Sequence, residues 1–322
     1  MKNMIFKEWA AIWLQQKEYL VKESTYANYS VALVNHIIPY LGEQFLKDID
    51  KMMVQKMVWH LLKSGRVDRS GGLSLKTVKD INNILMSCLR DAQQDEHYYN
   101  WKIMYPRKSE NRINGLVQII SINDTNIMLK SIRKNCTPEY LGFAISIYTG
   151  MRIGEICALK WEDIDMTERY IVVNKTLQRV YIKDFGGKNY SKIIIASPKT
   201  SKSKRIIPVN DSLYKLLNEC YPHKQESYVI TGRQTYLEPR AYRNRFKKFL
   251  RENKLPNIRF HAIRHTFATR CISSGIDYKT VSELLGHSSV NLTMNLYVHC
   301  QMEEKRRCTE ALDVLYRNNL IR

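Results

Sequence analysis

Residues 261–269 of the chain read HAIRHTFAT, in a part of the sequence where helical patterning dominates. Side chains three positions apart lie on one face of a helix, so His261 and Arg264 are expected to point to the same side. The arginine stays charged at any working pH and donates two parallel hydrogen bonds, whereas the histidine exchanges protons near neutral pH. This stretch therefore predicts a helix that offers a fixed cation beside a proton-exchanging group.

Three further side chains extend this set. Arg152 follows a Thr-Gly turn at the start of a helix, where backbone N–H groups also favour an anion. His287 follows Gly286, which is expected to end a short helix, and Tyr297 lies ten residues further on. Two arginines, two histidines and a tyrosine can hold a phosphodiester and attack it without a metal. A phenol that attacks phosphorus forms a phosphotyrosyl ester, which conserves the bond energy for religation and separates strand transfer from hydrolysis.

A lysine-rich run is predicted at the tip of a strand-turn-strand segment, residues 193–208. A lysine on a hairpin turn can reach into a DNA groove and protonate the departing 5′ oxygen as a general acid. Lys199 is the favoured candidate, and Lys202 and Lys204 stay open as alternatives. Lys202 and Lys204 are also expected to contact DNA.

The helix predicted from Glu238 onward is densely basic. Arg243, Lys247 and Arg251 recur every four residues and form one stripe, opposite an apolar side. Phosphate contacts from such a stripe give salt-dependent affinity that is largely blind to DNA sequence. These three residues are therefore predicted to bind the DNA backbone.

The overall charge favours a polyanionic partner. The formal net charge is +20 and the pI is about 9.6, which points first to nucleic acid and second to an anionic membrane surface. Residues 1–110 hold 16 basic and 12 acidic side chains, and residues 111–322 hold 35 and 19. The positive field is thus expected on the larger C-terminal part, which also carries the arginine-histidine-tyrosine set.

Cysteine usage and hydropathy predict a reduced, cytoplasmic protein. The seven cysteines are scattered without a CxxC pair, which indicates neither a disulfide framework nor a zinc site. The longest apolar stretch, around residues 141–148, is far too short to cross a bilayer, and the chain begins without a signal-peptide pattern.

Helical and strand periodicity predict two domains. Residues 1–110 read as an all-helical unit of four helices. The helical periodicity lapses at about residues 100–114, which are interpreted as the linker across the domain boundary. Residues 111–322 read as mainly helical with one small β-sheet over residues 170–209, an α+β domain. The expected fold is therefore mainly α with a small sheet.

Taken in order, these motifs resemble the tyrosine recombinase (phage integrase) family. The similarity lies in TGMRIGE at residues 149–155, HAIRHTFAT at 261–269, LLGHS at 284–288 and Tyr297. It covers essentially the whole chain, because the N-terminal helical unit looks like the core-binding domain of the family. Each string is moderately specific, whereas the full set in this order is highly specific.

The resemblance implies a role for each motif residue. Tyr297 would attack the scissile phosphate, forming a 3′-phosphotyrosyl link and freeing a 5′ hydroxyl. Arg152 and Arg264 would bind the phosphate, His261 would assist proton transfer with the tyrosine, and His287 would donate a hydrogen bond to the phosphate.

It also implies a general acid at Lys199 and a supporting carboxylate at Glu155. Residues 303–315 look like the C-terminal oligomerisation helix of the family. The implied partners are double-stranded DNA at specific recombination sites, three further copies of the chain in a tetramer, and an accessory directionality factor. Neither a metal nor a nucleotide cofactor is implied, and the expected location is the nucleoid in the cytoplasm.

Many element integrases carry an additional N-terminal arm-binding domain, whereas here the core-binding pattern starts almost at Met1, so control of direction through arm sites is not expected. A simpler Xer-type layout therefore stays open, although the strand region of residues 174–209 favours an integrase of a mobile element. A DNA-binding regulator without activity and a type IB topoisomerase are the alternative functions. A hydrolytic nuclease is disfavoured, because no carboxylate cluster suggests a pair of metal ions.

Overall fold

The computed structural model describes residues 4–92, 101–107, 118–186, 188–197, 204–221 and 226–297, together with residues 309, 310, 313 and 316. The chain divides into two compact units, which are described separately below. The first unit comprises Met1–Arg112 and Arg179–Ile193, and the second comprises Ile113–Gln178 and Ile194–Arg322. No helix in these described ranges is both long and apolar enough to span a membrane.

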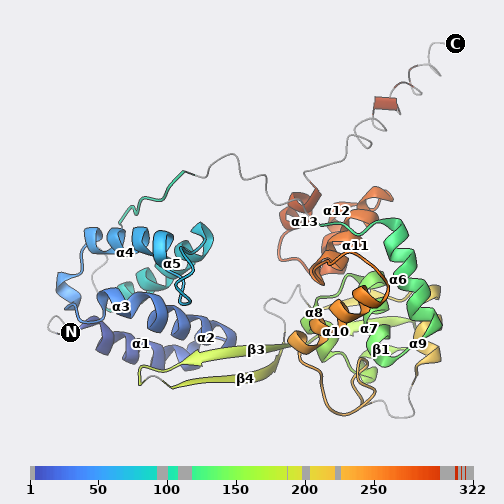
Figure 1. The fold of residues 1–322 in the computed structure, drawn as a ribbon, viewed down its shortest axis with the longest axis horizontal. Helices are drawn as coiled ribbons and strands as arrows, with labels where there is room; N and C mark the ends of the chain where they lie inside the picture. Colours follow the sequence, from blue (N-terminus) through green and yellow to red (C-terminus); the bar gives the residue numbers. More distant parts are fainter. Residues whose placement is uncertain are drawn as a thin grey trace. The chain divides into compact units, whose positions relative to one another are not determined.

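The first unit is built on helices (Figure 1). They are α1 (Phe6–Leu20), α2 (Glu23–Ala32), a π-turn (Leu33–Ile37), α3 (Ile38–Leu41), a 3₁₀ turn (Leu46–Asp48), α4 (Lys51–Ser64) and α5 (Leu75–Ala92). The side chains of Phe6, Trp9 and Trp13 in α1 are buried in their common core. The indole N–H of Trp9 donates to the Cys88 carbonyl at 2.9 Å, which ties α1 to α5.

Two helices of this unit, α4 and α5, begin with a side-chain cap. The Ser74 hydroxyl accepts from the Thr77 amide at 3.1 Å and so caps the start of α5. The helical segment continues past Pro39 to Leu41 and ends at Gly42. Pro39 lies in the first turn of α3, directly after the short π-helix of residues 33–37, and at this position its missing N–H needs no helical partner.

A β-hairpin returns to the first unit from far along the sequence. Its strands are β3 (Thr176–Lys183) and β4 (Asn189–Ala196), which pair with each other. The Lys183 amide donates to the Ser30 hydroxyl at 3.2 Å, Lys192 forms an ion pair with Glu23 at 3.1 Å, and Phe185 packs on the helical core. The end of the hairpin thus belongs structurally to the helical unit.

The second unit combines helices with a three-stranded sheet (Figure 1). Its helices are α6 (Ile122–Lys134), α7 (Pro138–Thr149), α8 (Ile153–Ala158), a 3₁₀ turn (Trp161–Asp163), α9 (Asp211–Glu219), α10 (Pro239–Glu252), α11 (His261–Ser273), α12 (Tyr278–Leu285) and α13 (Val290–Tyr297). Its strands are β1 (Ile164–Asp165), β2 (Tyr170–Val173) and β5 (Arg205–Pro208), in the order β1-β2-β5. The mainly α fold with small sheets confirms the predicted class.

The two strands predicted within residues 193–208 are present as β4 and β5, but the prediction that they form one hairpin was wrong. β4 pairs with β3, whereas β5 pairs antiparallel with β2 in the other sheet. The cause is burial: Ile207 of β5 lies opposite Ile171 of β2, and both side chains are removed from solvent. The lysine run consequently links two sheets and is not the tip of one hairpin.

An aromatic core fixes the helices that carry the candidate site. Phe143 of α7 stacks on Tyr242 of α10 with ring centres 5.1 Å apart, and Phe246 meets Phe260 edge-on at 5.1 Å. Such contacts add specific geometry to the apolar burial. Because Phe260 directly precedes α11, this core sets where α11 begins.

Candidate active site

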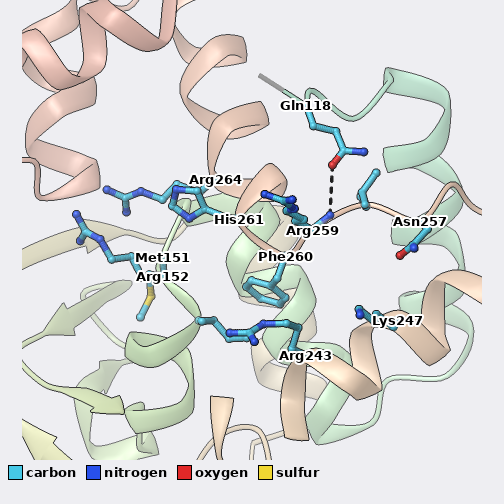
Figure 2. A pocket seen from close by; sticks show the side chains of 12 residues that line it. Gln118, Met151, Arg152, Arg243, Lys247, Asn257, Arg259, Phe260, His261 and Arg264 are labelled. Atoms are coloured by element: carbon cyan, nitrogen blue, oxygen red, sulfur yellow. Dashed lines mark hydrogen bonds between the residues drawn. The ribbon is translucent and has the colours of Figure 1, made fainter. Parts of the chain in front are cut away.

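A pocket of about 640 Å³ opens where the start of α8, the start of α11 and one side of α10 meet. Figure 2 shows that Arg152, His261 and Arg264 lie together at one side of the pocket. Arg243 and Lys247 of α10 also line it. The structure thus brings together residues that are more than a hundred positions apart in the sequence. His287 is not among the lining residues, but the turn before it bonds both arginines.

Arg264 is the most buried of the site cations, at 3% exposure. Its two terminal nitrogens donate to the Gly150 carbonyl at 2.9 Å and to the Leu285 carbonyl at 2.7 Å. Burial, and after it the positive charge of Arg152, lowers the pKa of the Arg264 guanidinium to about 9. The group therefore stays protonated at neutral pH.

Arg152 caps α8 and faces the same turn. Gly150 takes a left-handed conformation with φ of 65° and ends α7, so the chain reverses before Arg152 as the sequence predicted. The Arg152 guanidinium donates to the Leu285 carbonyl at 3.3 Å and to the Gly286 carbonyl at 3.1 Å. It also bonds the Glu155 carboxylate at 2.8 Å.

The two arginines keep donors for an anion. A guanidinium carries five N–H groups, and the bonds to described residues occupy three on Arg152 and two on Arg264. The bonded donors lock the orientation of each group, and the remaining ones suit the oxygens of a phosphate. The arrangement is preorganised to stabilise negative charge.

The imidazole ring of His287 contacts a hydroxyl group of α13. Gly286 ends α12 with φ of 62°, as predicted, and places His287 in the next segment. The Nδ1 atom of His287 lies 2.8 Å from the hydroxyl of Thr293, a fully buried residue of α13. Burial, and after it the charges of Arg264 and Arg152, lowers the pKa of His287 to about 4. If the hydroxyl donates to Nδ1, the neutral ring presents Nε2–H as a hydrogen-bond donor.

His261 begins α11 next to Arg264. Its ring stands edge-on to that of His265 with centres 4.4 Å apart. Partial burial, and after it His265 and Arg264, lowers the pKa of His261 to about 4. A neutral imidazole at the pocket wall can accept a proton, which the protonated form cannot do.

Glu155, the predicted supporting carboxylate, lies buried next to Arg152. Its side chain is 3% exposed and accepts from the Arg152 amide at 2.9 Å and from its guanidinium. A second cation, Arg205, pairs with the same carboxylate at 2.8 Å. Arg205 was not predicted as a site residue, because it directly follows the lysine-rich run and nothing in the sequence distinguishes it from those neighbouring basic residues. The need of a buried carboxylate for neutralisation was the available clue.

The predicted DNA-contact residues separate into two groups. Arg243 and Lys247 line the pocket, whereas Arg251 and Lys204 are exposed and lie outside its lining. Arg259 also lines the pocket and was missed; its amide bonds the Gln118 side chain at 3.3 Å (Figure 2). One isolated arginine before an aromatic residue carries no pattern that marks it.

Several predicted residues fall outside what the structure describes. Lys199 and Lys202 lie in the undescribed stretch 198–203, and most of the predicted helix 303–315 is likewise outside the described residues. Tyr297 is the last residue of α13, and its side chain is not described. In the described part of the chain, no group of three or more His, Cys, Asp or Glu side chains could hold a metal ion.

The chain is similar to several known proteins. Residues 109–304 match the model of the phage integrase family, and residues 5–62 match that of the phage integrase N-terminal SAM-like domain. The tyrosine recombinase XerC-like protein of Caldanaerobacter subterraneus subsp. tengcongensis is 31% identical over 76% of this chain and 68% of its own. The ICEBs1 integrase of Bacillus subtilis is 25% identical over 98% and 84%. The structure of the Tn1549 transposon integrase in complex with transposon right end DNA aligns with a TM-score of 0.69 at 21% identity, covering 96% of this chain and 100% of that chain.

Proposed function

The chain belongs to the phage integrase family and is a tyrosine-type site-specific recombinase, and we propose that Tyr297 is the residue that links it covalently to DNA. The proposal is supported by Arg152 and Arg264, which both line the pocket and both donate to the carbonyl oxygen of Leu285, so that two cations face the place where a phosphate would bind. α13, which ends at Tyr297, packs on α11 and α12 of the same unit. The tyrosine therefore belongs to a helix that contacts the site.

The reaction follows from the chemistry of these groups. The phenol oxygen of Tyr297 attacks phosphorus while His261, neutral because of its lowered pKa, accepts the phenolic proton. The P–O5′ bond breaks, and Lys199 donates a proton to the leaving oxygen. Arg152, Arg264 and His287 stabilise the charge on the nonbridging oxygens. Reversal with a different 5′ hydroxyl joins new strands.

DNA is the partner that this site and charge distribution suit. We assign DNA backbone contacts to Lys202, Lys204, Arg243, Lys247 and Arg251, and core-site binding to the helical part of residues 1–110, with residues 111–322 catalytic. A homotetramer on paired sites, an accessory directionality factor and association with the nucleoid complete the proposal. The similarity to the ICEBs1 and Tn1549 integrases supports a mobile element as the substrate.

A nicked suicide DNA substrate tests the nucleophile. After cleavage, the short strand that carries the freed 5′ hydroxyl diffuses away and cannot religate. The covalent protein–DNA complex therefore accumulates and is quantified on a denaturing gel. Trapping is expected for the native chain and absent for Tyr297→Phe, with DNA affinity unchanged. Tyr316→Phe, at an exposed tyrosine of the same C-terminal region, is the matched control. Equal trapping by native protein and Tyr297→Phe would refute the assignment.

A further inference from the structure

Arg205 is a buried cation that the reaction scheme above does not use. It begins β5, and its side chain is 5% exposed against a Glu155 side chain that is 3% exposed. The two terminal nitrogens lie 2.8 Å from Oε2 and 3.1 Å from Oε1 of Glu155, which makes the pair bidentate. Buried ion pairs are weak contributors to stability, because desolvation offsets their attraction. Fold stability alone is therefore a poor explanation for this pair.

The carboxylate of Glu155 is shared between two arginines. Its Oε1 also accepts from the Arg152 guanidinium at 2.8 Å, and its Oε2 from the Arg152 amide at 2.9 Å. With one carboxylate between two guanidinium groups, one positive charge is left over. Because the side chain of Arg152 is 37% exposed and that of Arg205 only 5%, the surplus charge meets the pocket through Arg152.

Arg205 has a second connection, to the end of α12. Its Nε–H donates to the Leu284 carbonyl at 2.6 Å. The next two carbonyls, of Leu285 and Gly286, accept from the site arginines, and His287 follows directly. Three arginines thus donate to three successive carbonyls of one turn. Of the three, Arg205 is the one that lies on a strand of the sheet.

We propose that Arg205 is a positioning residue for DNA cleavage: it neutralises Glu155 so that the charge of Arg152 remains free for the phosphate, and it anchors the turn that carries His287. This inference rests on the proposed function. Burial alone would raise the pKa of Glu155, but the hydrogen bonds and charges of Arg205 and Arg152 lower it, which keeps the carboxylate ionised as the scheme requires.

Two variants test the proposal in the full-length protein. Arg205→Met removes the charge and all donors at similar size, and Arg205→Lys keeps the charge. Both are assayed at a temperature where circular dichroism shows complete folding. We expect Arg205→Met to slow single-turnover cleavage about 10²-fold at saturating protein, with a DNA Kd close to native, because misplaced groups act on the chemical step. Arg205→Lys is expected to recover at least about tenfold of that loss.

A readout without DNA separates this inference from the proposed function. His287 faces the charges of Arg264, Arg152 and Arg205 together with His261. Loss of Arg205 should therefore raise the pKa of His287 in an NMR titration of ¹⁵N-histidine-labelled protein, and Arg205→Lys should keep it low. If native protein forms no covalent complex, the proposed function fails while this titration still decides the positioning role. A folded Arg205→Met protein with native cleavage or a native His287 pKa would overturn the proposal, as would a lysine variant no faster than the methionine one.

Discussion

Arg152 and Arg264 donate to the same acceptor, the carbonyl oxygen of Leu285, at 3.3 and 2.7 Å. Two guanidinium groups that share one oxygen repel each other, and the lowered pKa of Arg264 reflects burial and that neighbouring charge. An anion between them relieves this repulsion. The protein backbone therefore holds in place a cationic pair that a phosphodiester completes.

The first prediction concerns the planar fork of Arg152. Arg152→Lys keeps the charge but loses the parallel donors, so cleavage of the suicide substrate should fall roughly 10²–10³-fold. Single-turnover rates at saturating protein measure this effect separately from DNA affinity. Arg169→Lys, in an exposed ion pair with Asp211, is the matched control and should cleave like the native protein. A rate for Arg152→Lys within about threefold of native would show that charge alone suffices.

The second prediction concerns pH. The pKa values of His261 and His287 are both about 4, so both rings are neutral in free protein at neutral pH. Lowering the pH protonates them only as it approaches these values, and His261 then loses its capacity to accept a proton. The second-order rate of covalent complex formation, which reports ionisations of the free protein, should stay flat from about pH 7.5 to about pH 5.5. A decline centred near the ordinary histidine pKa of about 6.5 would contradict the neutral-ring arrangement.

The third prediction concerns Gly150, whose carbonyl accepts from Arg264. A Cβ added there would lie 2.6 Å from Cδ1 of Phe267 and 2.8 Å from Cδ2 of Leu285, on a backbone with φ of 65°. Gly150→Ala should therefore lower the free energy of unfolding by about 1–3 kcal/mol or more in urea titrations, and it should slow cleavage. Gly275→Ala is the control, because φ is 86° there but nothing lies within 4 Å of the new atom. It should lose less stability and keep native cleavage.

The fourth prediction separates the pocket-lining cations from other charges of α10. Arg243→Ala and Lys247→Ala should each reduce the slope of log Kd against log salt by about one unit, equally on target and random DNA. Lys248→Ala is the control, because Lys248 pairs with Glu252 at 3.7 Å and does not line the pocket. A loss restricted to target DNA would mean that these side chains read bases.

Local chemistry explains which parts of the structure could be predicted. The helix ends at Gly150 and Gly286 follow from residues that tolerate positive φ, and the cap at Ser74 follows from its hydroxyl. The pairing of β5 with β2 could not be predicted, because it depends on a buried contact between Ile171 and Ile207, residues separated in sequence by the whole β3–β4 hairpin. Short-range turn patterns favoured the wrong neighbour.

The same distinction applies to the site. His261 and Arg264 share a helix, so their proximity is a local property of the sequence. Arg205 lies next to Glu155 only because β5 pairs with β2 in the folded sheet. The two residues are 50 positions apart, and no sequence periodicity at that spacing could reveal the pair. Sequence motifs therefore identify groups that could meet the substrate more readily than the groups that hold them.

The return of residues 179–193 to the helical unit makes that unit discontinuous in the polypeptide. A fragment that stops at residue 112 would leave Ser30 without the Lys183 amide and Glu23 without Lys192, and would expose the surface that Phe185 covers. No single cut of the gene separates the two units. Exchange of the N-terminal region between related enzymes would therefore have to carry the distal hairpin with it.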